Sequence, residues 1–185
     1  MEPQTDINSF RQVVLSLNEL EIPYFLTGSL ALAVYSRPRL SHDIDFCVHM
    51  QKPHVSKMVG RLGNDFYIDA QMMTEAIDTQ HMFNIIHLGT NEKMDFFIFN
   101  PSDPVPDFCF QNLQKVKLFG LPVPIPTLEG ILLIKLRWIK LGGGPIHDQD
   151  IRILIDENQD RIQWDRVNRV AEQAALTGIL RGYHS

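Results

Sequence analysis

Two aspartates share one face of a short apolar stretch. Asp43 and Asp45 alternate with Ile44, Phe46 and Val48, and successive side chains of a β-strand point to opposite faces. The two carboxylates therefore point the same way, about 7 Å apart along the strand, and repel each other. A sheet that keeps two like charges this close generally holds a cation between them. The pattern predicts a cation site.

A third carboxylate, Asp95, interrupts the apolar stretch Met94–Phe99. A carboxylate inside a sheet needs a metal, a basic partner or several hydrogen bonds. Three converging carboxylates suit Mg²⁺, which prefers oxygen ligands and completes its coordination with water and substrate phosphates. Such ions can orient a triphosphate and activate an attacking hydroxyl. We therefore predict Asp43, Asp45 and Asp95 as metal ligands and catalytic residues.

Glycine and serine precede the acid pair, where an apolar strand ends and a helix-compatible stretch begins. Gly28 lets the backbone approach a phosphate closely, and a helix N-terminus offers unpaired N–H groups to an anion. Ser29 adds a hydroxyl to the same turn. The order along the chain is a phosphate site followed by a metal site.

One lysine falls inside an apolar helical stripe. Lys135 lies in the middle of the stripe formed by residues 128, 131, 132, 138 and 139. A lysine that faces a core needs a partner, or it extends its ammonium outward as a structural lysine. A nucleoside triphosphate or one of the strand aspartates would be a suitable partner.

Simpler interpretations of the acids stay open at the level of sequence. In one, Asp43 and Asp45 are solvated acids on an exposed edge strand. In another, Asp95 is a buried acid paired with Lys93 or Arg39.

A further pair of acids follows the glycine-rich segment near residue 144. Asp148 and Asp150 lie early in an expected helix, where the helix dipole alone favours acids. We prefer this simpler interpretation to a catalytic one.

Hydrophobic periodicity predicts the elements that carry these residues. Apolar runs and alternation predict strands, whereas spacings of three and four predict helices. The prolines between residues 100 and 126 favour short edge strands over a helix, and Thr127 is a suitable helix N-cap. The predicted strands are 24–27, 43–48, 66–68, 82–88, 92–99 and 116–119, and the predicted helices are 6–20, 53–63, 127–141, 147–157 and 163–176.

This layout predicts an α+β fold, with a mixed β-sheet flanked by helices over residues 1–126. Residues 127–185 form a helical C-terminal portion that we expect to pack on the sheet as part of one compact domain. The length of 185 residues and the 44% hydrophobic content are sufficient for such a core.

Composition restricts partners and location. A net charge of −5 predicts no global attraction to nucleic acid or to an anionic membrane. Cys47 and Cys109 are far apart in apolar surroundings, which favours two buried thiols over a disulfide. No apolar run approaches the ~20 residues of a membrane helix, and the first residues are not typical of a signal peptide. We expect a soluble, cytoplasmic protein.

The same motifs resemble those of the nucleotidyltransferase fold superfamily. Leu26–Ser29 and Asp43–Phe46 match its two defining motifs, and Met94–Phe96 matches its third. The segment Arg39–Phe46 further resembles a small stand-alone branch that includes AbiEii-type toxins. A weaker similarity to the helical motif of this branch spans Leu128–Arg137 and continues to Asp148 and Asp150.

The resemblance, which covers residues 24–156, implies an enzyme that transfers a nucleoside monophosphate from a nucleoside triphosphate to an acceptor hydroxyl and releases pyrophosphate. It implies two Mg²⁺ ions held by the first two acids, with Asp95 helping to activate the acceptor. Nucleotide binding would involve Gly28, Ser29, Arg39, Ser41 and Lys135.

The acceptor is not specified by the sequence: members of the superfamily modify small molecules, proteins or RNA ends. The toxin-like branch implies a cognate antitoxin protein as a partner. An alternative function is a non-catalytic nucleotide-binding or protein-interaction scaffold with the same fold, which the small size of the chain favours.

Overall fold

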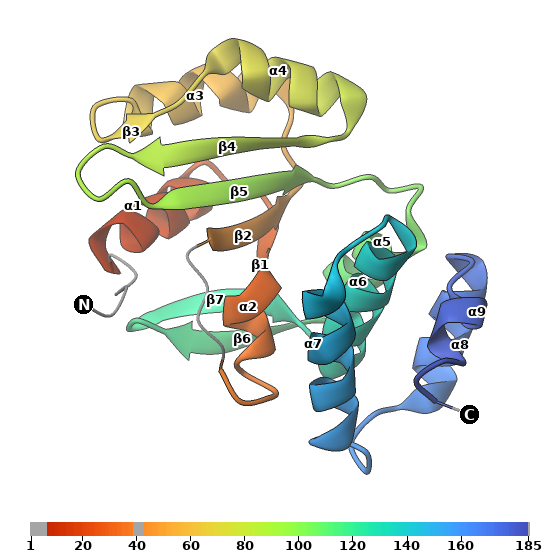
Figure 1. Ribbon diagram of the computed structural model, residues 1–185. Helices are drawn as coiled ribbons and strands as arrows, with labels where there is room; N and C mark the ends of the chain where they lie inside the picture. The colour runs from red at the N-terminus through yellow and green to blue at the C-terminus, as the bar shows by residue number, and fades with distance from the viewer. Residues whose placement is uncertain (1–6, 39–42, 185) are drawn as a thin grey trace. The chain divides into compact units, whose positions relative to one another are not determined.

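In the computed structural model, residues 7–38 and 43–184 are described (Figure 1). The chain forms two compact units. Unit 1 draws on the segments Met1–Leu30, Leu40–Phe99 and Lys115–Ile125, and unit 2 draws on Ala31–Arg39, Asn100–Gln114 and Pro126–Ser185. The expected division into domains after residue 126 stays a prediction.

Unit 1 contains a five-stranded mixed sheet. Its strands lie in the order β1-β2-β5-β4-β3. Only β2 and β5 pair in parallel, and the other neighbours are antiparallel. The fold is therefore α+β, as predicted. The strands are β1 (Tyr24–Thr27), β2 (Asp43–Val48), β3 (Phe66–Tyr67), β4 (Met82–His87) and β5 (Lys93–Ile98).

One face of this sheet is sealed by aromatic side chains. Phe46, Phe96 and Phe83 are register partners on β2, β5 and β4, and their rings stack with centroids 5.2 and 4.9 Å apart. Phe10 of helix α1 (Ile7–Glu19) stacks on Phe46. Burial of each ring contributes about 1.5–3 kcal/mol. Because side chains alternate along a strand, the acids lie on the opposite face.

The remaining helices of this part of the chain are α2 (Gly28–Leu32), α3 (Lys52–Leu62) and α4 (Ala70–Thr79). Helices α3 and α4 pack against each other, and α4 also packs on β4 (Figure 1). The sequence analysis did not predict α4, which buries only Met73 and Ala76. Its start is defined by Asp69, whose carboxylate accepts hydrogen bonds from two backbone N–H groups at 2.8 and 2.9 Å.

Unit 2 is built mainly from helices around α6 (Leu128–Lys140). This helix contacts the other four, α5 (Pro104–Gln111), α7 (Pro145–Asp156), α8 (Trp164–Gln173) and α9 (Thr177–Leu180). Thr127 caps α6, as predicted, by accepting a hydrogen bond from Gly130 N.

The preference for strands over a helix was wrong for part of the proline-rich segment. Residues 104–111 form α5, which Asp103 caps through Val105 N at 3.1 Å. Pro104 and Pro106 both lie in the first helical turn, where a missing N–H costs nothing. The predicted edge strand at 116–119 does exist, within the two-stranded sheet of β6 (Leu113–Leu118) and β7 (Leu121–Pro126).

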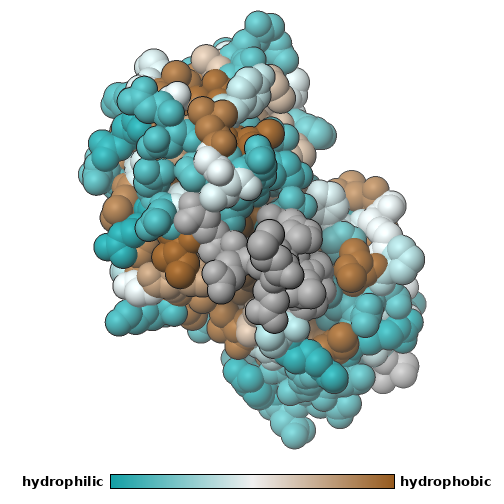
Figure 2. All heavy atoms as spheres, turned by 60° about the vertical axis from the view of Figure 1, so that its left-hand side comes forward, coloured by the Kyte–Doolittle hydropathy of each residue, from teal (hydrophilic) through white to brown (hydrophobic). Residues whose placement is uncertain are grey.

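Three smaller observations complete the fold. Cys47 and Cys109 are both buried and form no disulfide with each other, as predicted. Within the part of the chain that the structure describes, every helix is too short or too polar to cross a membrane. On the face shown in Figure 2, hydrophobic side chains form separate patches on a largely hydrophilic surface.

Candidate metal and nucleotide site

The three predicted acids lie on adjacent strands of unit 1. Asp45 on β2 is the register partner of Asp95 on β5, and Asp43 is the partner of Lys93. Register partners on neighbouring strands lie about 4.8 Å apart and point to the same face. Asp43 shares that face because it lies two residues before Asp45. The three acids therefore share one face of the sheet, opposite the aromatic core.

A lysine bridges two of these acids. Lys93 Nζ donates a hydrogen bond to Asp95 Oδ2 at 2.9 Å and lies 3.6 Å from Asp43 Oδ1. The side chain of Asp95 is 10% exposed and that of Asp43 is 49% exposed. The hydrogen bond to Asp95, aided by the charges of both acids, raises the pKa of Lys93 against the opposing effect of burial.

This bridge supports the sequence interpretation in which Asp95 pairs with Lys93. It also places a positive charge where the alternating acids predict a cation. The sequence analysis named Lys93 only as an alternative partner. The spacing of two residues between Lys93 and Asp95 nevertheless indicated this pairing, because residues two apart on a strand share a face.

Several buried oxygens near the acids lack hydrogen-bond partners among the described residues. They are Asp95 Oδ1, Thr27 Oγ1 and Ser29 Oγ. Thr27 is the register partner of Asp45, so the acid face extends to β1. Leaving such an atom unpaired costs about 1–3 kcal/mol, which a ligand could recover.

This set of oxygens fits a magnesium ion chemically, since Mg²⁺ prefers carboxylate and hydroxyl oxygens. Across residues 7–38 and 43–184, no three His, Cys, Asp or Glu side chains converge closely enough to form a metal site by themselves. Magnesium sites commonly use one or two carboxylates and take the remaining ligands from water and phosphates. The described acids therefore do not complete a metal site by themselves.

The Gly28 turn fixes the position of Asp45. β1 ends at Thr27 and α2 begins directly at Gly28, so the predicted strand and helix follow each other, with Gly28 and Ser29 in the first turn of the helix and not in a separate turn before it. Gly28 has a φ of +67°, and a Cβ added there would lie 1.9 Å from Asp45 Oδ2. Glycine favours this backbone conformation, and the close approach of the carboxylate leaves no room for a Cβ. The predicted phosphate turn and the acid pair are therefore in direct contact.

Lys135 lies in unit 2, where its ammonium has a carboxylate partner. Lys135 Nζ donates to Asp150 Oδ2 at 2.7 Å, and the two side chains are 3% and 2% exposed. The lysine is therefore buried, not extended to solvent, and Asp150 is not simply a solvated acid near a helix N-terminus. The predicted role of Lys135 in nucleotide binding stays a prediction.

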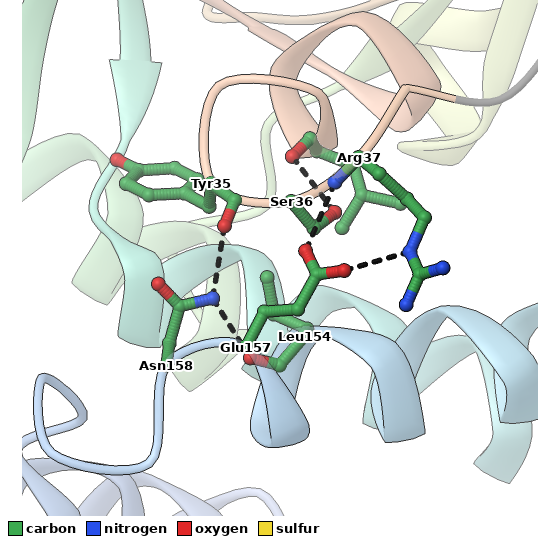
Figure 3. A network of polar contacts seen from close by, with 7 residues as sticks. Tyr35, Ser36, Arg37, Leu154, Glu157 and Asn158 are labelled. Carbon is green, nitrogen blue, oxygen red and sulfur yellow. Dashed lines mark hydrogen bonds and ion pairs between the residues drawn. The ribbon is translucent and has the colours of Figure 1, made fainter.

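Two other predicted nucleotide-binding residues, Arg39 and Ser41, lie outside the described residues. The segment that leads to them is anchored within unit 2 (Figure 3). Asn158 Nδ2 donates to Tyr35 O at 2.9 Å. The backbone N and Nε of Arg37 both donate to the Glu157 carboxylate, at 3.0 and 2.7 Å. These contacts fix residues 35–37 on the C-terminal end of α7.

Comparisons of the sequence found no matching protein-family model and no matching curated protein. Solved structures match over nearly the whole chain. A nucleotidyltransferase-like antigenic protein from Paracoccidioides brasiliensis has 17% identity and a TM-score of 0.55, covering 97% of this chain and 94% of its own.

The antibiotic-resistance factor ANT(2'')-Ia is similar in two structures. Its solution structure has 14% identity and a TM-score of 0.60, covering 98% of both chains. Its complex with adenylyl-2''-tobramycin has 12% identity and a TM-score of 0.53, covering 96% of this chain and 99% of that one. The resemblance to the AbiEii-type branch stays a prediction. The chain has the fold of the nucleotidyltransferases, which is the fold that its Gly-Ser and Asp-x-Asp motifs indicate.

Proposed function

We propose that this protein is a magnesium-dependent nucleotidyltransferase. It would transfer a nucleoside monophosphate from a nucleoside triphosphate to an acceptor hydroxyl and release pyrophosphate. The observation that carries the proposal is the set of three carboxylates on one sheet face, with Asp45 in contact with the Gly28 turn. The nucleotidyltransferase fold supports it.

In this proposal, Asp43, Asp45 and Asp95 hold one or two Mg²⁺ ions. Bound magnesium would orient the phosphates and neutralise the charge that develops during transfer. The unpaired Oδ1 of Asp95 lies on the acid face and is buried, so it is suited to accept the proton of the acceptor hydroxyl. The hydroxyl oxygen of the acceptor would attack the α-phosphorus, and the bond between the α-phosphorus and the oxygen that bridges to the β-phosphorus would break as pyrophosphate leaves.

The Gly28 turn would hold the triphosphate. The space of the missing Gly28 Cβ is filled by Asp45 Oδ2, so the part of this turn that is suited to a phosphate is Ser29 Oγ, which has a hydrogen bond to donate. Arg39, Ser41 and Lys135 complete the proposed nucleotide-binding set. Lys135 can take part only if it exchanges Asp150 for a phosphate oxygen.

A small-molecule hydroxyl is the first acceptor class to test. The motivation is the ANT(2'')-Ia structure, which contains an adenylylated aminoglycoside. Protein and RNA-end acceptors are the next classes. The cytoplasmic location and the antitoxin partner remain predictions from the sequence.

The proposal can be tested by incubating the protein with Mg²⁺, each of the four α-labelled nucleoside triphosphates and an acceptor panel that includes aminoglycosides. We expect a labelled acceptor and free pyrophosphate from the wild type, and neither product from the Asp45→Asn variant. A matched control is Asp78→Asn, which removes an exposed carboxylate paired with Lys52. Equal labelling by the wild type and Asp45→Asn would contradict the assignment.

A nucleotide-binding scaffold without turnover is the second candidate, and Lys93 favours it. Its ammonium partly neutralises Asp43 and Asp95 without any metal, so these acids can be retained for folding alone. Thermal stabilisation by Mg²⁺ and a nucleoside triphosphate, without pyrophosphate release on any acceptor, would support sensing. No stabilisation at all would support an interaction scaffold.

A further inference from the structure

Unit 2 contains a cavity between α5 and α8. Its volume is about 500 Å³, within the range of small-molecule sites, roughly 300–1,000 Å³. Its lining includes none of the acids or turn residues of the proposed nucleotide site. The polar residues on its walls include Asp107, Gln111 and Asn112 on one side and Arg166, Arg169 and Gln173 on the other.

The lining is positively charged in an acidic protein. Arg166 and Arg169 lie three residues apart on α8 and therefore share one helix face. The single acid of the lining, Asp107, accepts a hydrogen bond from Gln111 at 2.8 Å. Two arginines against one acid on a chain of net charge −5 make this cavity a local attractor for anions.

The two arginines differ in how they are held. Arg166 lies over the ring of Phe108, with its guanidinium carbon 5.3 Å from the centroid, and donates a hydrogen bond to Asn112 Oδ1. Arg169 makes no hydrogen bond or ion pair with any residue that the structure describes, and it is exposed at the cavity. Arg166 is thus oriented in advance, and the fork of Arg169 can bind an incoming carboxylate or phosphate.

The rest of the lining offers rigid apolar surface. Pro101, Pro104 and Val170 join Phe108 around the cavity. Proline and phenylalanine lose little conformational freedom when a ligand binds, and they present flat faces to a ring. We propose that this cavity binds a small organic anion: a flat ring that packs on the apolar wall and carries a phosphate or carboxylate bound by Arg169.

Phenyl phosphate is a suitable probe, because it joins an aromatic ring to a dianion. We would titrate the full chain by calorimetry at physiological salt, without Mg²⁺ or nucleotide. The expected result is saturable binding that Arg169→Gln weakens by about tenfold or more, the typical effect of losing a charge-assisted hydrogen bond. Arg181→Gln is the matched control, since Arg181 is an exposed arginine of unit 2 outside the cavity lining. We expect it to bind like the wild type.

Two further probes identify what the cavity recognises. Benzoate in place of phenyl phosphate shows whether a carboxylate or a phosphate binds more tightly. Benzyl alcohol has the ring without the charge and should bind at least about tenfold more weakly. Unchanged affinity in Arg169→Gln, equal affinity for benzyl alcohol, or no saturable binding at millimolar phenyl phosphate would each overturn the proposal. None of these results depends on whether the chain transfers nucleotides.

Discussion

At the scale of single residues, Lys93 supplies a positive charge that partly neutralises the carboxylates of the acid face. Its ammonium contacts Asp95 and lies near Asp43, and a magnesium ion between these acids would have to displace it. The lysine is 39% exposed, so solvent screens the pair and the displacement should cost little. In the proposed site, Lys93 would therefore compete with the metal, and its charge would become available to a phosphate on displacement.

Lys93→Met should tighten the binding of Mg²⁺ alone by several-fold, because removing a neighbouring positive charge favours a cation. Isothermal titration with MgCl₂ and no nucleotide measures this directly. Lys52→Met is the control, since Lys52 forms a comparable exposed pair with Asp78 on another part of unit 1. Weaker Mg²⁺ binding in Lys93→Met would show that the lysine supports the metal site.

Gly28 is the other residue whose identity matters. Gly28→Ala should lower the free energy of unfolding by about 1–3 kcal/mol, because alanine is strained at positive φ and its Cβ would collide with Asp45. Urea denaturation measures the change. Gly60→Ala is the control: its Cβ meets nothing within 4 Å in the interior of α3, so it should stabilise by about 0.5–1 kcal/mol. Equal effects at both glycines would contradict the observed turn.

At the scale of elements, the strands that carry the acids are predictable from local sequence. The predictions for β1 and β2 agree with the structure at both ends, and β5 begins and ends one residue inside its predicted range. Apolar runs bounded by turns give these strands a strong local signal. The weaker signals failed: α4 buries only two side chains, and α5 begins in prolines that normally argue against a helix.

Strand register is the part that local sequence does not contain. The motifs indicated which acids matter, but the pairing of Asp45 with Asp95 depends on contacts between segments about fifty residues apart. For the same reason the sequence analysis missed Thr27, which reaches the acid face only through its pairing with β2. The Asp150 partner of Lys135 was missed because it depends on the packing of α6 against α7.

The buried pair between α6 and α7 gives a prediction at this scale. Lys135→Met alone should destabilise the protein by about 3–5 kcal/mol, because it removes the cationic partner of a carboxylate that is only 2% exposed. The double variant Lys135→Met/Asp150→Leu should recover most of this loss. Lys57→Met, at an exposed position of α3, should change stability by less than about 0.5 kcal/mol. Urea denaturation compares the three variants.

The double variant also tests the predicted nucleotide role of Lys135. If Lys135 binds a phosphate, the folded double variant should lose nucleotide affinity. If its role is structural, the affinity should stay at the wild-type level. A double variant as unstable as Lys135→Met would contradict the ion-pair explanation.

At the scale of the whole molecule, the segments that form the two units alternate along the sequence. Residues 31–39 and 100–114 belong to unit 2 but lie between segments of unit 1. No single cut in the sequence separates the units. Every experiment proposed above therefore uses the full chain.

Net charge gives the whole molecule a further property. The chain has a net charge of −5, and three of its carboxylates lie in the proposed nucleotide site beside the phosphate turn. A nucleoside triphosphate is itself strongly negative, so it would be repelled from this face without a divalent cation. Nucleotide binding should therefore require magnesium.

The central claim is that the acids on β2 and β5 and the Gly28 turn form one magnesium–nucleotide site. The most direct measurement is equilibrium binding of non-hydrolysable nucleoside triphosphate analogues, with Mg²⁺ and with EDTA, to the wild type, Asp45→Asn and Asp78→Asn. We predict saturable binding only with Mg²⁺, retained in Asp78→Asn and weakened by at least about tenfold in Asp45→Asn. Binding that persists in EDTA, or equally in Asp45→Asn, would contradict the account.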